Sequence, residues 1–362
     1  MDLAKFSITQ WFILAVIIYI MATFTRLSKK DYQFGCKKVD GLTKIVVVLI
    51  LVILSLLAAN RTGIGDTATY VLQFNRVTVN TKEFFETLKY DGEWGFKVVN
   101  FVIKKVFGSN ETIFLFVFSF MIIGGIFVFF LQESDNIELC IIVYFLGGSL
   151  VTGLNGMRQA LVASFFVLSS KLITKKKIVP YIIICLALST VHKSALFLLP
   201  VFFVLRMKAW KKGSYILFAV AILMYVAYPV FGNILTDFLE GSTYEGYSEG
   251  IVNFKDGGAN ILRAGVYIVP VLLSFVFRKK LESEKPNLGI LVNATILNFM
   301  FMLLASVKSW IFARFCIYFT PFSIILLDWC IQVSGKYKKL LYPACLFFYS
   351  IFFYYEMMSF IV

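Results

Sequence analysis

Long apolar runs, separated by short clusters of lysine and arginine, dominate this sequence. A helix needs about 20 apolar residues to cross a bilayer. We predict spans at roughly 8–25, 43–60, 112–131, 137–152, 157–173, 178–191, 195–206, 214–235, 264–277, 288–306, 312–331 and 340–360. A water-soluble core cannot bury so many apolar runs. The pattern therefore predicts an all-α, polytopic membrane protein with about 12 transmembrane helices and two larger outer loops.

The composition supports the membrane class and argues against nucleic acid as a partner. Hydrophobic residues make up 59% of the chain and charged residues 15%, whereas a soluble domain has about one quarter charged residues. The net charge of +14 is divided among short runs between apolar segments, and a nucleic-acid site needs a single basic patch. The six cysteines lie mostly within apolar segments without C-x-x-C spacing, so we interpret them as packing residues.

The lysine and arginine clusters also predict an orientation. One side of the twelve-span arrangement carries 21 Lys and Arg, and the other side carries 7 when the long segment 61–111 is left out. Because positive residues accumulate on the cytoplasmic side, the lysine-rich side is predicted to be cytoplasmic and both termini to lie outside.

Two substantial segments fall on the predicted outer side, and the whole of 1–362 is predicted to form one transmembrane domain. Segment 61–111 contains a helical pattern that suits a helix lying in the membrane interface. Its predicted apolar face consists of Phe96, Val99, Ile103, Val106 and Phe107. Segment 236–262 is rich in Gly, Tyr and acidic residues, so we expect a mobile loop that covers a groove.

Polar residues collect at the outer ends of the predicted helices and in the outer segments. They are Arg61, Asp66, Tyr70, Glu93, Arg158, Gln159, His192, Lys193, Lys308 and Arg314. Charged groups at membrane depth are costly and mark function. Several cations on one face favour an anionic ligand such as pyrophosphate, which the planar guanidinium of arginine binds through two donors.

Simpler interpretations exist for the same residues. Arg158 and Arg314 also suit helix ends whose side chains snorkel towards water. His192 alternatively caps a helix or bonds a backbone carbonyl, and Asp66 alternatively caps the helix that follows it. We interpret three further residues as anchors or structural groups: Lys193, Lys308 and Asp328.

The order and spacing of several motifs resemble the EpsG family of Wzy-type polysaccharide polymerases. N-x-x-R-Q-x-x-x-A begins at Asn155 and is followed, after a lysine run, by A-x-x-x-x-H-x-S-A around His192. Earlier elements are G-D-T-x-x-Y from Gly65 to Tyr70 and E-x-G-F from Glu93 to Phe96. A-R-F-x-x-Y-F from Ala313 to Phe319 resembles the late element of the family.

The resemblance implies a glycosyltransferase that joins undecaprenyl-pyrophosphate-linked repeat units into exopolysaccharide, capsule or O-antigen. The implied location is the plasma membrane of a bacterium, with the active site on the outer side. Lipid-linked donor and acceptor are the expected partners, together with a flippase and a chain-length regulator. No cofactor and no metal are expected.

The resemblance also suggests a role for each candidate residue. His192 or Asp66 is the expected base that deprotonates the acceptor hydroxyl. Binding of pyrophosphate or glycan is expected from Arg158, Gln159, Arg314, Arg61, Tyr70, Glu93 and Asn155.

Three alternative functions remain at this stage. A flippase for lipid-linked oligosaccharides shares the hydropathy, although it should carry polar residues at mid-membrane and related halves. A glycan ligase has a closely related mechanism. A membrane acyltransferase is disfavoured, because the single histidine has no evident acidic partner in the sequence.

Overall fold

The computed structural model describes residues 2–27, 31–33, 36–88, 92–239, 258–307 and 310–361. The described part is helical apart from turns and one antiparallel hairpin, β1 (Asp31–Gln33) and β2 (Cys36–Lys38), in which Tyr32 pairs with Lys37. The chain divides into two compact units, Met1–Val201 with Lys339–Val362, and Phe202–Lys338. That they form one transmembrane domain stays a prediction.

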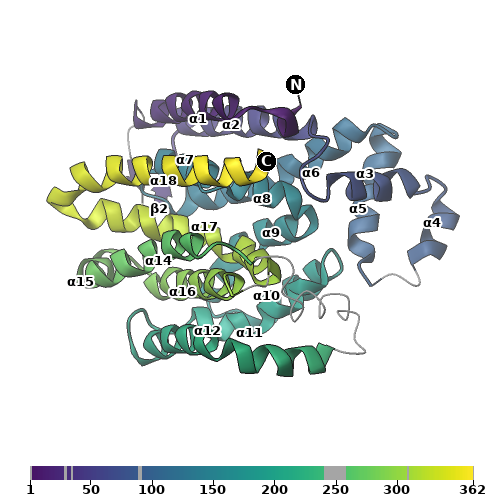
Figure 1. Ribbon diagram of the computed structural model, residues 1–362. Helices are drawn as coiled ribbons and strands as arrows, with labels where there is room; N and C mark the ends of the chain where they lie inside the picture. The colour runs from purple at the N-terminus through teal and green to yellow at the C-terminus, as the bar shows by residue number, and fades with distance from the viewer. Residues whose placement is uncertain are drawn as a thin grey trace. The chain divides into compact units, whose positions relative to one another are not determined.

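The first unit contains the amino-terminal helices and the last helix of the chain (Figure 1). Its α-helices are α1 (Ile8–Thr23), α2 (Gly41–Ala59), α3 (Thr67–Arg76), α4 (Thr81–Leu88), α5 (Trp94–Phe107), α6 (Glu111–Glu133), α7 (Ile137–Leu146), α8 (Ser149–Asn155), α9 (Met157–Thr174), α10 (Ile178–Ser189) and α18 (Lys338–Ile361). Short 3-10 helices are η1 (Leu3–Lys5), η2 (Phe24–Leu27) and η3 (Lys193–Phe197). Helix α11 (Leu198–Leu205) runs across the boundary between the units.

The second unit is built around one buried helix. Its elements are α12 (Lys212–Leu239), α14 (Ile261–Val276), α15 (Arg278–Glu284), α16 (Leu288–Ala305), α17 (Trp310–Val333) and η4 (Gly335–Tyr337). Helix α16 packs against α12, α14 and α17 and is buried over almost its whole length. Its Asn298 amide donates to Ser323 Oγ over 2.9 Å and accepts from Thr320 Oγ1 over 3.3 Å, which satisfies polar groups within the apolar bundle.

Every segment predicted to span the membrane lies on helix, but the predicted number of spans is not confirmed. In the described residues, six helices are long and apolar enough to cross a membrane, or up to eight if two bent pairs each count as one span. The bent pairs are α7 with α8, at 58°, and α14 with α15, at 74°. The helices on the predicted spans 157–173, 178–191 and 195–206 do not meet the same length and hydropathy criteria, and for the span 214–235 the finding covers only Lys212–Ala227, a shorter apolar stretch of α12.

Polar caps explain where the first three long helices begin. Ser7 and Gln10 form a capping box at α1, and the Asp40 side chain accepts from the Thr43 N–H at the start of α2. Asn110 Oδ1 accepts from the Ile113 N–H over 3.0 Å at the start of α6. Each cap satisfies an amide that the first helical turn leaves without a partner.

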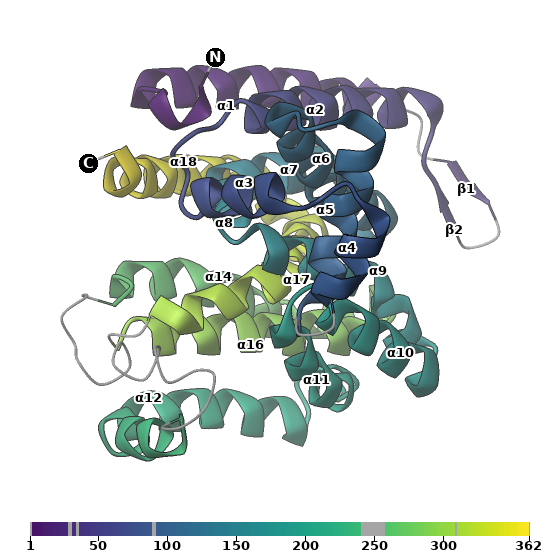
Figure 2. The same cartoon turned by 90° about the vertical axis from the view of Figure 1, so that its right-hand side faces the viewer.

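Aromatic stacking fixes the segment 61–111 on the start of α6. Phe74 of α3 stacks on Phe114 with ring centroids 4.4 Å apart, and Phe96 of α5 packs on Phe118 at 5.4 Å. The Lys104 ammonium of α5 donates to three carbonyls at the carboxyl end of α3, including the Asn75 carbonyl at 2.7 Å. Figures 1 and 2 show α3, α4 and α5 grouped at one end of the unit.

Helix α5 exists as predicted, but its buried face differs from the predicted apolar face. Phe96 and Ile103 are buried against the protein, whereas Val106 is 65% and Phe107 53% exposed. Lys104, which does not belong to the predicted apolar face, is buried because its charge binds the carbonyls that end α3. The helix therefore packs on α3 and α6 through a mixed surface.

Contacts within the first unit agree with an alternating path of its helices. The Asp2 carboxylate accepts from the Thr62 N–H over 3.1 Å, so the amino terminus lies at the same end of the unit as segment 61–111. Trp11 near the start of α1 packs on Phe353 near the end of α18, with ring centroids 6.2 Å apart.

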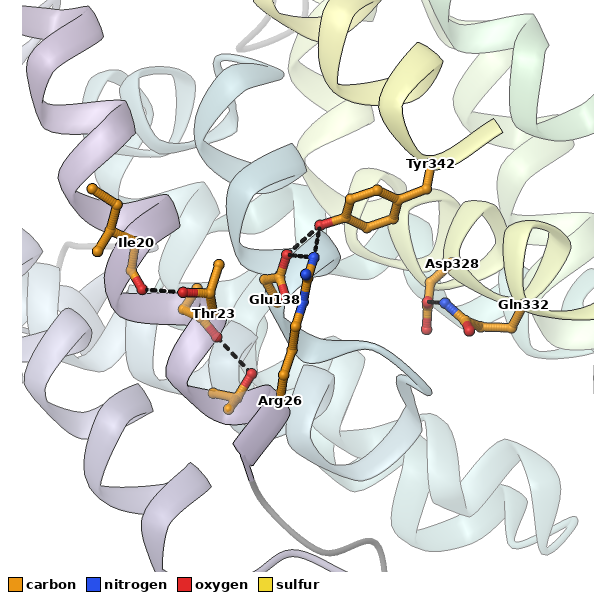
Figure 3. A network of polar contacts seen from close by, with 9 residues as sticks. Ile20, Thr23, Arg26, Glu138, Asp328, Gln332 and Tyr342 are labelled. Atoms are coloured by element: carbon orange, nitrogen blue, oxygen red, sulfur yellow. Dashed lines mark hydrogen bonds and ion pairs between the residues drawn. The ribbon is translucent and has the colours of Figure 1, made fainter. Parts of the chain in front are cut away.

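Three polar side chains, here called the Glu138 cluster, join η2, α7 and α18 in the first unit. Glu138 of α7 is fully buried, and Figure 3 shows Arg26 of η2 and Tyr342 of α18 pointing at its carboxylate. Arg26 Nη2 donates to Glu138 Oε1 over 2.6 Å and to the Tyr342 hydroxyl over 2.9 Å. The sequence alone gave no indication of this buried acid.

Most of the predicted mobile loop lies outside the described residues. Residues 240–257 are not described, so the prediction for 236–262 stays a prediction. At its borders, α12 continues to Leu239, and Ala259 donates its N–H to the Ala305 carbonyl over 2.9 Å.

Candidate functional site

The carboxylate of Glu93 binds side chains from two other parts of the first unit. Arg158 Nη1 lies 2.5 Å from Glu93 Oε2, and His192 Nδ1 lies 2.8 Å from Glu93 Oε1. The Lys193 N–H donates to Oε1 over 2.8 Å. Glu93 precedes the first turn of α5 without making a side-chain cap, so its carboxylate serves these partners instead. We call Glu93, Arg158 and His192 the Glu93 cluster.

Gly95 allows the helix to reach the turn that carries the histidine. The Gly95 N–H donates to the Thr190 carbonyl over 2.8 Å, where α10 ends. A Cβ at Gly95 would lie 2.2 Å from Thr190 Oγ1 and 2.9 Å from the Thr190 carbonyl carbon. The absence of a side chain thus lets Glu93 approach His192.

Arg158 rests on two aromatic rings. It lies in the first turn of α9, and its guanidinium carbon lies 5.7 Å from the ring centroid of Tyr70 and 5.5 Å from that of Phe96. The two rings meet edge to face, with centroids 6.0 Å apart. Stacking on aromatic faces orients a guanidinium, and the Arg158 side chain remains 27% exposed.

The electrostatics of the Glu93 cluster fix the tautomer of neutral His192. Burial raises the pKa of Glu93, but the hydrogen bond with His192, the Lys193 N–H and the charge of Arg158 outweigh burial and lower the pKa to about 2. Glu93 is therefore ionised and can only accept hydrogen bonds. The proton must then be on Nδ1 of a neutral imidazole, which leaves Nε2 as the basic nitrogen. In the described part of the chain, Nε2 has no partner.

Arg61 is buried where α2, α3 and α6 meet. Its side chain donates to the Ala58 carbonyl over 2.6 Å, to Thr67 Oγ1 over 3.1 Å and to Ser119 Oγ over 3.1 Å, and so connects α2, α3 and α6. Burial lowers its pKa to about 10, partly opposed by Tyr70, so Arg61 stays positive at neutral pH. No carboxylate pairs with it among the described residues.

Asp66 and Asn155 lie together at a second contact between distant segments. Asn155 Oδ1, at the end of α8, accepts from the Asp66 N–H over 3.1 Å. Gly65 has a φ of +50°, and a Cβ there would lie 1.8 Å from Asn155 Oδ1, so this position requires glycine. Asp66 stands at the cap position of α3 without a side-chain cap bond, so the capping interpretation is not supported.

The remaining predicted residues occupy different environments. Gln159 is buried in α9, and Arg314 lies in α17 of the second unit. Lys193 joins the Glu93 cluster through its backbone N–H. Lys308 lies outside the described residues. Asp328 accepts from Gln332 within α17 over 3.1 Å, consistent with a structural role.

One expectation about the site is wrong: His192 does have an acidic partner, Glu93, 99 positions earlier in the chain. With this pair, the lack of an acidic partner no longer argues against a membrane acyltransferase. Arg158 itself is preceded by the short helix α8, which follows a break at Gly147 and Gly148 and ends at Gly156.

The organisation of the site does not follow from the sequence. Glu93, which is predicted to bind pyrophosphate or glycan, holds Arg158 and His192. Phe96, which is predicted on the apolar face of its helix, also lies against the Arg158 guanidinium, and Gly95 makes the close contact with Thr190. The E-x-G-F motif was the available signal, because it combines the acid, the close-contact glycine and the aromatic ring in four residues. The described residues contain no cluster of three His, Cys, Asp or Glu side chains suited to a metal.

These features define a class of protein: a helical, multi-pass membrane protein with an arginine and a histidine oriented by one carboxylate. The chain belongs to the EpsG family, whose model matches residues 44–362. This is the family of Wzy-type polysaccharide polymerases, and membership implies a membrane polysaccharide polymerase type of function. No curated protein and no solved structure matches this chain.

Proposed function

We propose that this protein joins undecaprenyl-pyrophosphate-linked repeat units into a polysaccharide at the outer leaflet of a bacterial plasma membrane. Family membership supports the polymerase class. The observation that carries the assignment of residues is the Glu93 cluster, in which one carboxylate holds Arg158 and His192. These groups supply the two functions that a transfer from a lipid pyrophosphate requires, a cation for the leaving group and a base for the acceptor.

The proposed reaction is a transfer of the growing glycan to a new repeat unit. The oxygen of an acceptor sugar hydroxyl forms a bond to the anomeric carbon of the donor glycan. The bond between that carbon and the pyrophosphate oxygen breaks, and lipid pyrophosphate leaves with the electron pair. The proton of the acceptor hydroxyl passes to the base, for which His192 Nε2 or Asp66 is available.

Arg158 is suited to hold the departing pyrophosphate. It binds Glu93 through Nη1 alone, which leaves Nη2 for a phosphate oxygen. Within the described residues its buried Nε also has no partner. The buried charge of Arg61, which interacts electrostatically with Tyr70, adds positive potential near the ring on which Arg158 rests. Arg314 is proposed as a second pyrophosphate ligand, as its motif suggests.

Glu93 is proposed as a positioning residue for the base. Its ionised carboxylate fixes the proton on Nδ1 and directs Nε2 towards a proton donor. Replacing His192 by Gln should abolish nearly all transfer if His192 is the base. Appreciable activity in His192→Gln would shift the base role to Asp66, held near Asn155 by its backbone.

Placement of the reaction on the outer side is supported by the charge bias of the lysine runs and by contacts within the first unit. Asp2, Thr62 and segment 61–111, which contains Glu93, lie at one end of that unit. The buried polar side chains of α16, Asn293, Thr295 and Asn298, are uncharged and hydrogen-bonded to neighbouring protein groups, which suits helix packing better than a transport path. A ligase remains the closest alternative in mechanism.

The decisive experiment is to identify the lipid-linked glycan that accumulates in a cell lacking the gene. A single repeat unit on the lipid indicates a polymerase. Accumulation of full-length polymer on the lipid would indicate a ligase. Accumulation on the inner leaflet would indicate a flippase.

Matched arginine variants then test the site. Arg158→Lys and Arg314→Lys keep the charge but lose the planar fork, so transfer should fall roughly 10- to 100-fold at unchanged protein level. Arg76→Lys, an exposed change at the end of α3, is the control and should retain activity. Full activity of Arg158→Lys would contradict pyrophosphate binding by this residue. Full activity of Arg314→Lys alone would contradict pyrophosphate binding by Arg314.

A further inference from the structure

Arg61 contacts four different elements of the first unit through one guanidinium. Nη1 donates to the Ala58 carbonyl of α2 and to Ser119 Oγ of α6. Nε donates to Thr67 Oγ1 at the start of α3 over 3.1 Å, and Nη2 donates to Met157 Sδ at the start of α9 over 3.4 Å. The residue is only 2% exposed, so protein groups rather than a substrate occupy its donors.

Two of these contacts lie next to residues of the candidate site. Thr67 directly follows Asp66, and Met157 directly precedes Arg158. Nε and Nη2 lie on one edge of the planar guanidinium, so the same rigid group reaches both neighbours. Arg61 therefore links the turn that holds Asp66 to the first turn of α9, which holds Arg158.

The turn that carries Asp66 is closed by the same threonine. Thr67 Oγ1 donates to the Ile64 carbonyl over 2.6 Å and accepts from Arg61, so one hydroxyl closes the turn and binds the guanidinium. The Asp66 N–H donates to Asn155 Oδ1, at the end of α8. The turn is therefore attached to the junction of α8 and α9 in two ways, directly through Asn155 and indirectly through Arg61.

Stability alone is a poor reason for an arginine at this position. Burying a charge without a counter-ion costs free energy, and among the described residues no carboxylate pairs with Arg61. Its acceptors are one carbonyl, two hydroxyls and a thioether, and a thioether is a weak acceptor. A rigid group with several donors in fixed directions is suited instead to holding separate chain segments in register.

We propose that Arg61 is a positioning residue that holds Asp66 at a fixed distance from Arg158. This inference rests on the function proposed above, in which Asp66 is a candidate base and Arg158 binds the leaving group. Misplacing such groups by about 1 Å lowers a reaction rate about 100-fold. Arg61 thus sets the geometry of the site without touching the substrate, in place of the ligand role expected from the sequence.

The test removes the acceptors of Arg61 one at a time and measures transfer by the full-length protein in detergent. The donor is the lipid-linked glycan isolated from cells that lack the gene. Thr67→Val removes the acceptor of Nε and Met157→Leu that of Nη2, so each should lower kcat about tenfold and leave the KM for the donor unchanged. Thr67→Ser keeps the hydroxyl and should retain the wild-type kcat.

Ser119→Ala is the matched control, because it also removes a buried hydroxyl that accepts from Arg61. Nη1 keeps the Ala58 carbonyl at 2.6 Å, and neither Asp66 nor Arg158 adjoins Ser119 in the sequence, so kcat should stay unchanged. A loss in Ser119→Ala as large as in Thr67→Val would overturn the proposal. Wild-type kcat in both Thr67→Val and Met157→Leu would overturn it as well.

A combined variant tests whether Arg61 acts through its neighbour. Arg61→Lys keeps the charge but loses the fixed directions of the donors. If Arg61 acts through Thr67, the variant Arg61→Lys/Thr67→Val should have the kcat of Arg61→Lys alone, because the second change removes a contact that is already lost. Losses that simply multiply would show independent roles and contradict the proposal. The single changes at Thr67 and Met157 decide the question if Arg61→Lys does not fold.

Amide hydrogen exchange gives a measurement that does not depend on transfer. The peptide that contains the Asp66 N–H should exchange about tenfold faster in Arg61→Lys and in Thr67→Val than in the wild type, and at the wild-type rate in Ser119→Ala. Faster exchange in a protein whose wild type transfers no glycan would support the link made by Arg61 and reject the polymerase. Unchanged exchange in a protein that does transfer glycan would reject the link and leave the polymerase.

Discussion

Glu93 shows how one side chain organises a site without being the obvious chemical group in it. The same carboxylate orients a guanidinium over two aromatic rings and fixes the tautomer of an imidazole. Its low pKa reflects these contacts, since burial by itself acts in the opposite direction. The contacts, rather than the exposure of the carboxylate, therefore set its charge.

The lowered pKa of Glu93 makes a prediction about stability. The ordinary pKa is 4.5 and the folded-state pKa is about 2, so the contacts of the ionised carboxylate stabilise the folded protein at any pH above about 4.5. That contribution is lost as the pH falls from about 4.5 towards 2. In detergent, Glu93→Gln should unfold at a lower temperature than the wild type at pH 7, and the difference should shrink below pH 4.5.

The control for this measurement is Glu86→Gln, an exposed carboxylate on α4, which should leave the unfolding temperature at pH 7 unchanged. A difference between Glu93→Gln and the wild type that stays constant from pH 7 to pH 3 would contradict the assignment of the low pKa to these contacts.

Two helices of the first unit are held in place by charged side chains whose positions cannot be predicted from the apolar periodicity of the helices. Lys104 ties α5 to the carboxyl end of α3, and the Glu138 cluster ties α18 to η2 and α7. The two partners in the Glu138 cluster differ in exposure: the Arg26 side chain is 53% exposed and the Glu138 side chain is fully buried. A variant without the arginine therefore leaves a buried carboxylate, whereas a variant without the carboxylate leaves an exposed guanidinium.

This asymmetry predicts an order of stability losses. Arg26→Met leaves a buried carboxylate whose remaining partner among the described residues is the Tyr342 hydroxyl, and it should cost about 2–4 kcal/mol. Glu138→Gln leaves an arginine that can turn to water and should cost less, about 1 kcal/mol. Unfolding in detergent by a denaturant series measures both variants. A larger loss in Glu138→Gln than in Arg26→Met would contradict this account of the cluster.

The first unit carries the Glu93 cluster at one end of α9 and the lysine run 175–177 at the other end. Arg158 begins α9 and Lys175 follows its last residue, so they are separated by about 25 Å of helix. Glu93 and His192 lie with Arg158, whereas the lysine run 175–177 lies at the opposite end of α9. This separation is what an alternating membrane path would produce.

Accessibility labelling tests the orientation. In a cysteine-free background, Lys82→Cys in the outer segment should react with a membrane-impermeant maleimide in intact cells, and Lys175→Cys should react only after the membrane is opened. The positive-inside bias is the physical reason. Labelling of both positions from outside would reject the predicted topology. Labelling of Lys175→Cys alone from outside would show that the orientation is the opposite of the predicted one.

The sequence by itself determined the membrane class and the approximate positions of the long apolar helices, and it supplied candidate residues for the site. Apolar length and end-capping are local properties, so Asp40 and Asn110 mark helix starts that can be read directly. Only the tertiary structure decided which polar groups meet. Arg158 and His192 are 65 and 99 positions from Glu93, and no local pattern specifies such a contact. The tertiary structure also decided which face of α5 is buried, because the free-energy cost of burying the Lys104 charge is offset by carbonyls that α3 supplies.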